Sequence, residues 1–121
     1  MSKRILVVED HEDNRRILRD LLGNAGYDMV EAETGEAGLA AAAAQRPDLI
    51  LMDIQLPGID GYETTRRLKA DPALRAIPII VVTSYALSGD EVKAREAGCD
   101  AYVPKPYSPR QLLAKIREYL P

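Results

Sequence analysis

Residues 49–57 read Leu-Ile-Leu-Met-Asp-Ile-Gln-Leu-Pro, and the opening of this stretch decides the fold class. Leu49–Met52 is an apolar run without polar alternation, which is typical of a strand buried on both faces of a parallel sheet. The run stops abruptly at Asp53. The stretch therefore predicts a central strand whose carboxyl end carries an acid.

Further apolar runs lie on either side of this one, at residues 5–8, 29–32, 79–82 and 101–103. The run at 29–32 is the most polar, which suits an edge strand. The segments between the runs have helical periodicity, as in residues 17–25, where apolar side chains recur and Gly26 follows as a stop signal. Strand–helix alternation joined by right-handed crossovers predicts an α/β fold, a doubly wound parallel sheet of five strands with five helices.

Capping patterns mark the starts of several of these helices. Residues 108–111 combine an N-cap serine, a first-turn proline and a reciprocal glutamine, and apolar residues recur at helical spacing along 112–120. Residues 88–91 and 60–63 carry similar capping patterns. These signals predict helices that begin soon after the loops leaving the strands.

The composition limits the class of protein. The 121 residues are 46% hydrophobic and 29% charged, with a formal net charge of −3, and we expect a single domain over residues 1–121. This charge gives no basic surface for nucleic acid, and no apolar run approaches the roughly 20 residues that span a membrane. The single cysteine, Cys99, excludes an internal disulfide and suits the cytoplasm. We expect it to be a small buried residue on a helix.

Polar residues stand where the predicted strands end. Glu9 and Asp10 follow the first strand, Asp53 follows the third, Thr83 closes the fourth and Lys105 follows the fifth. In a doubly wound sheet, ligands bind outside the carboxyl ends of the strands, so these side chains should meet at one edge. Taken singly, each has an ordinary explanation, such as an acid at a helix N-terminus or a solvated lysine. Their shared position at the strand ends favours a functional site.

The expected cluster suits metal-assisted phosphoryl chemistry. Neighbouring carboxylates repel each other unless a cation lies among them, and Mg²⁺ prefers such an all-oxygen set of ligands. With positive charge from the metal and from Lys105, a phosphoryl group could approach the acids. Asp53 could then act as a nucleophile and form an aspartyl-phosphate, while Thr83 and Lys105 each bind a phosphoryl oxygen.

Several motifs resemble those of the receiver domains of two-component response regulators, and the resemblance extends over nearly the whole chain. The motifs are Val7-Val8-Glu9-Asp10, Leu51-Met52-Asp53-Ile54-Gln55-Leu56-Pro57, Val82-Thr83-Ser84 and Lys105-Pro106-Tyr107. The length and the residues around Asp53 also resemble single-domain regulators of the DivK type, which act through protein partners. The resemblance implies a flavodoxin-like sheet with strand order 2-1-3-4-5 and a third helix that begins at Gly61.

The same resemblance implies a role for each residue of the expected site. Asp53 would be the phosphoacceptor, and Thr83 and Lys105 would contact the phosphoryl group. Tyr102 would be the aromatic rotamer switch. Mg²⁺ would be held, directly or through water, by Glu9, Asp10, Asp53 and the backbone carbonyl of Gln55.

The implied function is a phosphorylation-dependent switch and not an enzyme with a separate substrate. A histidine kinase or a histidine phosphotransfer protein would donate the phosphoryl group. The surface of the fourth helix, fifth strand and fifth helix would then change for a downstream protein partner or for self-association. No direct contact with nucleic acid or membrane is expected.

Two alternatives remain open. One is a receiver excised from a larger regulator or hybrid kinase, although a chain that starts at Met1 and ends at Pro121 without a linker favours a stand-alone protein. The other is a metal-dependent phosphohydrolase. Against the second, Gln55 stands where aspartate phosphohydrolases carry a second acid, and the single histidine, His11, should be exposed beside Asp10.

Narrower expectations concern single residues in and around the expected site. Glu9 stands where the family more often has aspartate. The lysine at the end of the last strand must turn inward while the chain leaves for the next helix, which predicts a cis peptide bond between Lys105 and Pro106. Gln55 and Tyr85 would flank the approach of water to the phosphoryl group. The bulk of Tyr85 predicts slow self-dephosphorylation.

Overall fold

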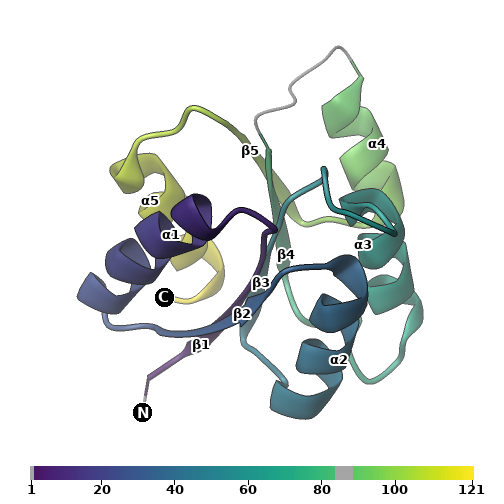
Figure 1. The fold of residues 1–121 in the computed structure, drawn as a ribbon, viewed down its shortest axis with the longest axis horizontal. Helices are drawn as coiled ribbons and strands as arrows, with labels where there is room; N and C mark the ends of the chain where they lie inside the picture. The colour runs from purple at the N-terminus through teal and green to yellow at the C-terminus, as the bar shows by residue number, and fades with distance from the viewer. Residues whose placement is uncertain (1, 84–88) are drawn as a thin grey trace.

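Five parallel strands form one sheet in the order β2-β1-β3-β4-β5 in the computed structural model, which describes residues 2–83 and 89–121 (Figure 1). The predicted flavodoxin-like α/β fold is therefore confirmed, and the most polar run lies at an edge as expected. The strands are β1 (Arg4–Val8), β2 (Asp28–Ala32), β3 (Leu49–Met52), β4 (Ile79–Thr83) and β5 (Ala101–Pro104).

Helices cover both faces of the sheet (Figure 1). One face carries α1 (Glu12–Asn24) and α5 (Pro109–Tyr119), and the other carries α2 (Gly35–Gln45), α3 (Gly61–Ala70) and α4 (Asp90–Ala97). Successive strand residues point to opposite faces, so Ile5 packs on the α1–α5 side and Leu6 on the other. Burial on both faces explains the apolar runs. Within the described residues, no helix combines the length and the apolar character needed to cross a membrane.

The strand registers bring the carboxyl ends of the strands to one edge. Val8 pairs with Met52 between β1 and β3, and Thr83 pairs with Pro104 between β4 and β5. The residues that follow these strands therefore leave the sheet side by side. Asp53 stays tied to the sheet, because its amide donates to the carbonyl of Val8 at 3.1 Å.

Helix starts follow the predicted capping patterns where they can be compared. At α5, the side chain of Ser108 accepts from the amide of Gln111 at 3.1 Å, and the side chain of Gln111 accepts from the amide of Ser108 at 2.9 Å. This capping box is confirmed. Asp60 caps α3, which begins at Gly61 as expected. The pattern at residues 88–91 involves Ser88, which lies outside the described residues.

Two predictions about single residues are wrong. Ile17, the first residue of the apolar helical pattern expected over residues 17–25, is 61% exposed and does not face the sheet. The residues facing the sheet are Leu18 and Leu22, and a neighbour one position away is rotated by about 100°. Cys99 is buried as expected but lies in the loop after α4, because Gly98 adopts a φ of 109° and ends the helix.

Candidate functional site

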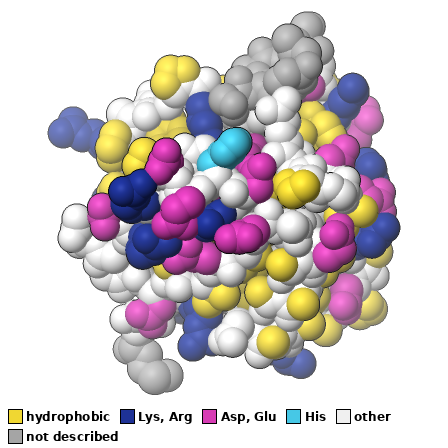
Figure 2. All heavy atoms as spheres, viewed as in Figure 1, with side chains coloured by type: hydrophobic (Ala, Val, Ile, Leu, Met, Phe, Trp, Pro, Cys, Tyr) yellow, Lys and Arg dark blue, Asp and Glu magenta, His cyan; other side chains and the backbone are white. Residues whose placement is uncertain are grey.

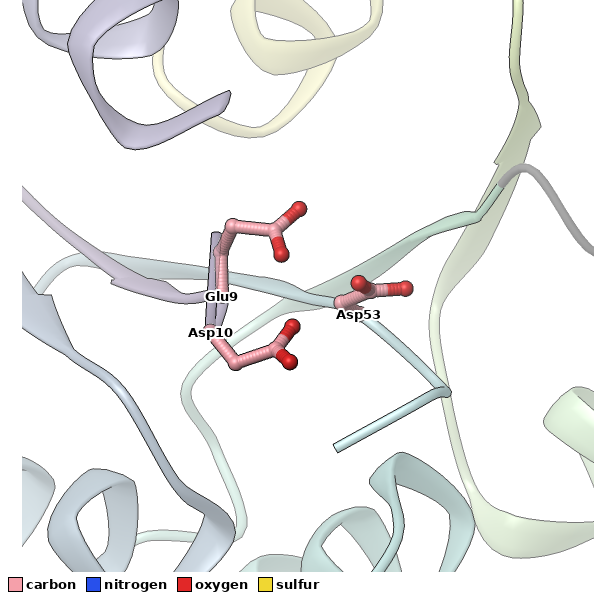
Figure 3. A group of neighbouring side chains, drawn as sticks. All are labelled: Glu9, Asp10 and Asp53. Atoms are coloured by element: carbon pink, nitrogen blue, oxygen red, sulfur yellow. The ribbon is translucent and has the colours of Figure 1, made fainter. Parts of the chain in front are cut away.

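Three acidic side chains meet at the carboxyl edge of the sheet. Glu9 and Asp10 follow β1, Asp53 follows β3, and one carboxylate oxygen from each lies within 4.8 Å of the others. Figure 3 shows the three carboxylates around a common space. Glu9 is 3% exposed and Asp53 is 9% exposed, so water screens their charges poorly. The structure thus brings together the acids that the sequence analysis expected at this edge.

Lys105 brings a positive charge to the same edge. Its Nζ lies 3.1 Å from Oε1 of Glu9, and its backbone amide donates to the carbonyl of Thr83 at 2.7 Å. Thr83 is the last residue of β4 and is fully buried. The peptide bond between Lys105 and Pro106 is cis, as predicted. The lysine therefore partly balances the charge of the acids through its contact with Glu9.

The two acids after β1 have different surroundings. Glu9 accepts hydrogen bonds from the amide of His11, from Asn14 Nδ2 and from Lys105 Nζ, each at 3.1 Å. Oδ1 of Asp10 is buried and has no hydrogen-bond partner among the described residues. The exposed imidazole of His11 lies 3.9 Å from it, beyond hydrogen-bond distance. A buried carboxylate oxygen without a donor is costly, and a hard cation would satisfy it.

The buried carboxylates have opposite pKa shifts. Burial, and then the charge of Glu9, raise the pKa of Asp53 to about 6, against the lowering influence of Lys105 and of the Ile54 amide. At Glu9 burial is the largest single influence and raises the pKa, but the His11 amide and Lys105 together outweigh it, and the pKa is lowered. When no cation is bound, Asp53 is therefore the one of these two acids that keeps its proton to the higher pH. A cation in the cluster would favour its ionised form.

A close backbone contact fixes the loop after Asp53. The amide of Gly61 donates to the carbonyl of Ile54 at 2.8 Å. A Cβ atom at position 61 would collide with the backbone carbonyl of Asp53, so only glycine leaves room for this approach. The start of α3 is thereby held against the strand end that carries the acid.

The other expected residues lie around this edge. Gln55 is exposed in the loop that follows Asp53. Tyr102 lies in β5, half-buried against the core on the α2–α4 side of the sheet. Tyr85 lies outside the described residues, so its expected role at the phosphoryl group stays a prediction.

Two residues that contact Glu9 were not singled out from the sequence. Asn14 donates to its carboxylate, and Nη1 of Arg15 donates to its backbone carbonyl at 2.8 Å. Both lie near the start of α1, the helix that begins directly after the acid pair. Polar residues at that position in the chain are the one signal that could have pointed to them.

Comparison with known proteins identifies the family. Residues 5–117 match the family model described as the response regulator receiver domain. The chain is 46% identical over 120 residues to the polar-differentiation response regulator DivK of Brucella anthropi, and the alignment covers 99% of this chain and 98% of that protein.

Solved structures agree with this match. The receiver domain of a sensor histidine kinase from Pseudomonas aeruginosa, which has a magnesium ion coordinated in its active site cleft, superposes with a TM-score of 0.92 at 34% identity, covering 99% of this chain and 98% of that chain. A CheY-like receiver domain protein from Methanospirillum hungatei gives a TM-score of 0.92 at 36% identity, covering 99% and 94%. Sequence and fold together show that the chain belongs to the family of response regulator receiver domains.

Proposed function

We propose that this chain is a signalling switch that accepts a phosphoryl group on Asp53 in the presence of Mg²⁺. The observation that carries the proposal is the cluster of Glu9, Asp10 and Asp53, in which Glu9 and Asp53 are buried, with Lys105 beside it. Receiver domains of response regulators are generally switches and not enzymes with a separate substrate. We propose that this chain catalyses only its own phosphorylation and dephosphorylation, and that residues 1–121 act as one receiver domain in the cytoplasm.

The metal ion would be held by oxygen ligands at the sheet edge. They are the carboxylates of Glu9, Asp10 and Asp53 and the backbone carbonyl of Gln55. The unpaired Oδ1 of Asp10 and the close approach of the carboxylates support this assignment, as does the magnesium ion in the Pseudomonas relative. When bound, Mg²⁺ would supply positive charge that reduces the repulsion between the acids and an incoming phosphoryl group.

The transfer would be a displacement at phosphorus. A carboxylate oxygen of Asp53 forms a bond to phosphorus while the bond from phosphorus to the donor's imidazole nitrogen breaks, and the electron pair of that bond stays on the nitrogen. Lys105 would exchange its contact with Glu9 for a phosphoryl oxygen, and the hydroxyl of Thr83 would donate to another. Both residues would then contact the modified aspartate directly.

A groove beside Lys105 supports a protein as the phosphoryl donor. The groove lies between α1 and residues 105–109, has a volume of about 330 Å³, and has Ile17 on its wall. An exposed apolar side chain next to a charged site suits a partner that packs a helix there and presents a histidine. We propose that a histidine kinase or a histidine phosphotransfer protein docks in this groove.

The proposed output surface consists of α4, β5 and α5. A hollow of about 430 Å³ between β5 and α5 is lined in part by Tyr102 and Tyr107, which offer amphipathic contact area. Capture of the phosphoryl group by Thr83 would let Tyr102 turn inward, and a downstream partner or a second copy would bind the changed surface. The accompanying shift expected for residues 84–87 concerns residues outside the described part of the chain.

Intact-protein mass spectrometry tests the acceptor. With Mg²⁺ and acetyl phosphate, the mass should rise by one phosphoryl group. Asp53→Asn, or addition of a chelator, should prevent the increase. A phosphoryl group that maps to a residue other than Asp53 would show that the acceptor is wrongly assigned.

A pair of exposed apolar residues tests the docking groove. Ile17 on α1 and Val92 on α4 are 61% and 59% exposed, so a glutamate at either position should disturb folding little. Ile17→Glu should slow transfer from the kinase by about tenfold, because a contact residue of the interface is lost. Phosphorylation by acetyl phosphate should not change. Equal kinase transfer rates in Ile17→Glu and Val92→Glu would place the donor elsewhere.

A further inference from the structure

Arg15 is buried at the start of α1 although it is charged. Its side chain is 6% exposed, whereas that of Arg19, one turn further along the helix, is 43% exposed. A guanidinium removed from water needs partners for its N–H groups. On the outer side those partners are acids: Nη2 donates to Glu12 at 2.7 Å and to Glu33 at 3.1 Å, and Nε lies 3.3 Å from Glu31. Figure 2 shows acidic and basic side chains intermixed over this part of the surface.

The other terminal nitrogen of the Arg15 guanidinium contacts the backbone of Glu9, the first acid after β1. Nη1 donates to the carbonyl oxygen of Glu9 at 2.8 Å. The amide of Glu9 donates to the carbonyl of Ala32 in β2 at 3.0 Å. The backbone of Glu9 is therefore held on both sides at the point where the chain leaves the sheet.

This restraint matters most for the next residue, Asp10. The carboxylate of Glu9 is held by its own hydrogen bonds, but Oδ1 of Asp10 has no such bond within the described part of the chain. The direction of the Asp10 side chain therefore depends on the peptide that precedes it. Arg15 fixes that peptide.

We propose that Arg15 is a positioning residue for Mg²⁺ binding that acts by holding the peptide between Glu9 and Asp10. This inference rests on the proposed binding of Mg²⁺ at the acid cluster. Charge alone would have the opposite effect, because a cationic side chain repels a metal ion and its removal would tighten binding. Loss of a bond that orients a ligand weakens metal binding, typically by about 10-fold to 100-fold. The sign of the change therefore separates a geometric role from an electrostatic one.

Arg15→Gln and Arg19→Gln form a matched pair of variants. Each removes one positive charge from α1, and both arginines contact Glu12 and Glu31. Among the described residues, Arg15 also reaches Glu9, and Arg19 does not. NMR titrations of the full chain with MgCl₂ should give a Kd about tenfold weaker for Arg15→Gln. The Kd of Arg19→Gln should be unchanged or slightly tighter.

Unchanged or tighter Mg²⁺ binding by Arg15→Gln would overturn the inference while leaving the proposed function intact. Absence of Mg²⁺ binding by the parent protein would overturn both. A second measurement needs no variant: in the metal-free parent, the guanidinium protons of Arg15 should exchange with solvent about tenfold more slowly than those of Arg19, because they are buried and bonded. Equal exchange rates would show that the bond to Glu9 is not maintained, which also overturns the inference.

Discussion

The acid cluster and the ion pairs between α1 and β2 both gather charged side chains, but they balance the charges differently. Arg19 contacts Glu31 at 2.7 Å and Glu12 at 3.3 Å, and the least exposed of these side chains is 30% exposed. At the sheet edge, Asp53 is almost fully buried and forms no ion pair with a lysine or arginine of the described residues. The charges around Arg19 are thus paired and close to water, and those of the buried Arg15 are paired with several acids. The carboxylate of Asp53 has no such ion pair among the described residues, and the proposed Mg²⁺ would supply the missing positive charge.

The comparison implies that the buried core raises the free energy of unfolding, whereas the ionised acid cluster lowers it when no metal is bound. Leu22 on α1 is fully buried on one face of the sheet. Leu22→Ala should lower the free energy of unfolding by about 3 kcal/mol, because it removes packed methyl groups and leaves a cavity. Urea unfolding measures this loss. The Mg²⁺ affinity of the folded variant should match that of the parent, and a weaker affinity would mean that core and site cannot be separated.

Neutralising Asp53 should have the opposite effect. The folded pKa of Asp53 is raised by burial to about 6 from 3.8, so the protonated acid stabilises the fold fully below about pH 4. This contribution is lost as the pH rises through 6. Asparagine cannot ionise, so Asp53→Asn should raise the free energy of unfolding of the metal-free protein by roughly 2 kcal/mol at pH 7. Urea unfolding in a chelator should show no such gain near pH 4, and destabilisation at pH 7 would contradict this account.

Binding of Mg²⁺ should offset the destabilising effect of the acid cluster on the free energy of unfolding. A ligand that binds only the folded protein adds about 1.4 kcal/mol to the free energy of unfolding for each tenfold excess over its Kd. The addition should be larger for the parent than for Asp53→Asn, because the variant offers less negative charge. Thermal unfolding with MgCl₂ measures it. NaCl at the same ionic strength is the control, and an equal effect of NaCl would indicate charge screening without a bound metal ion.

The smallest effect on the free energy of unfolding is expected at the hydrogen bond between the neutral hydroxyl of Tyr62 and the buried Asp90. The hydroxyl of Tyr62 on α3 donates to Oδ1 of Asp90 on α4 at 3.2 Å. Burial, and then the charge of Asp90, raise the pKa of Tyr62 to about 12. Tyr62→Phe should lower the free energy of unfolding by about 1 kcal/mol and leave the Mg²⁺ affinity unchanged. Ultraviolet titration of the parent should show one tyrosine ionising later than the others. If the late ionisation is still seen in Tyr62→Phe, it belongs to another tyrosine.

The fold was largely predictable because strands buried on both faces require continuous apolar runs, and Leu49–Met52 is such a run. The parallel topology then brings the residues after the strands to one edge, which is why Glu9 and Asp53 could be expected together. The position of Ile17 could not be predicted with the same certainty, because helical periodicity does not tell which of two neighbouring rows faces the sheet.

The finer features of the site depend on packing between distant segments. Arg15 is held by acids on β2 and just after it, and no spacing along the chain indicates that its guanidinium turns back to Glu9. The unpaired oxygen of Asp10 likewise follows from side-chain orientation. The composition and the residues at the strand ends therefore predict which residue types lie together at the site. They do not predict which hydrogen bonds those residues form.

The two outer strands of the sheet are built in a way that disfavours pairing with another chain. β5 ends at Pro104, which has no N–H to offer, and β2 carries Asp28 and Glu31. A short strand, a proline and charged side chains are the usual means of protecting exposed sheet edges from edge-to-edge aggregation. If two copies pair after phosphorylation, we expect the contact to use side chains and not a continuous sheet across two molecules, because both edges disfavour strand pairing.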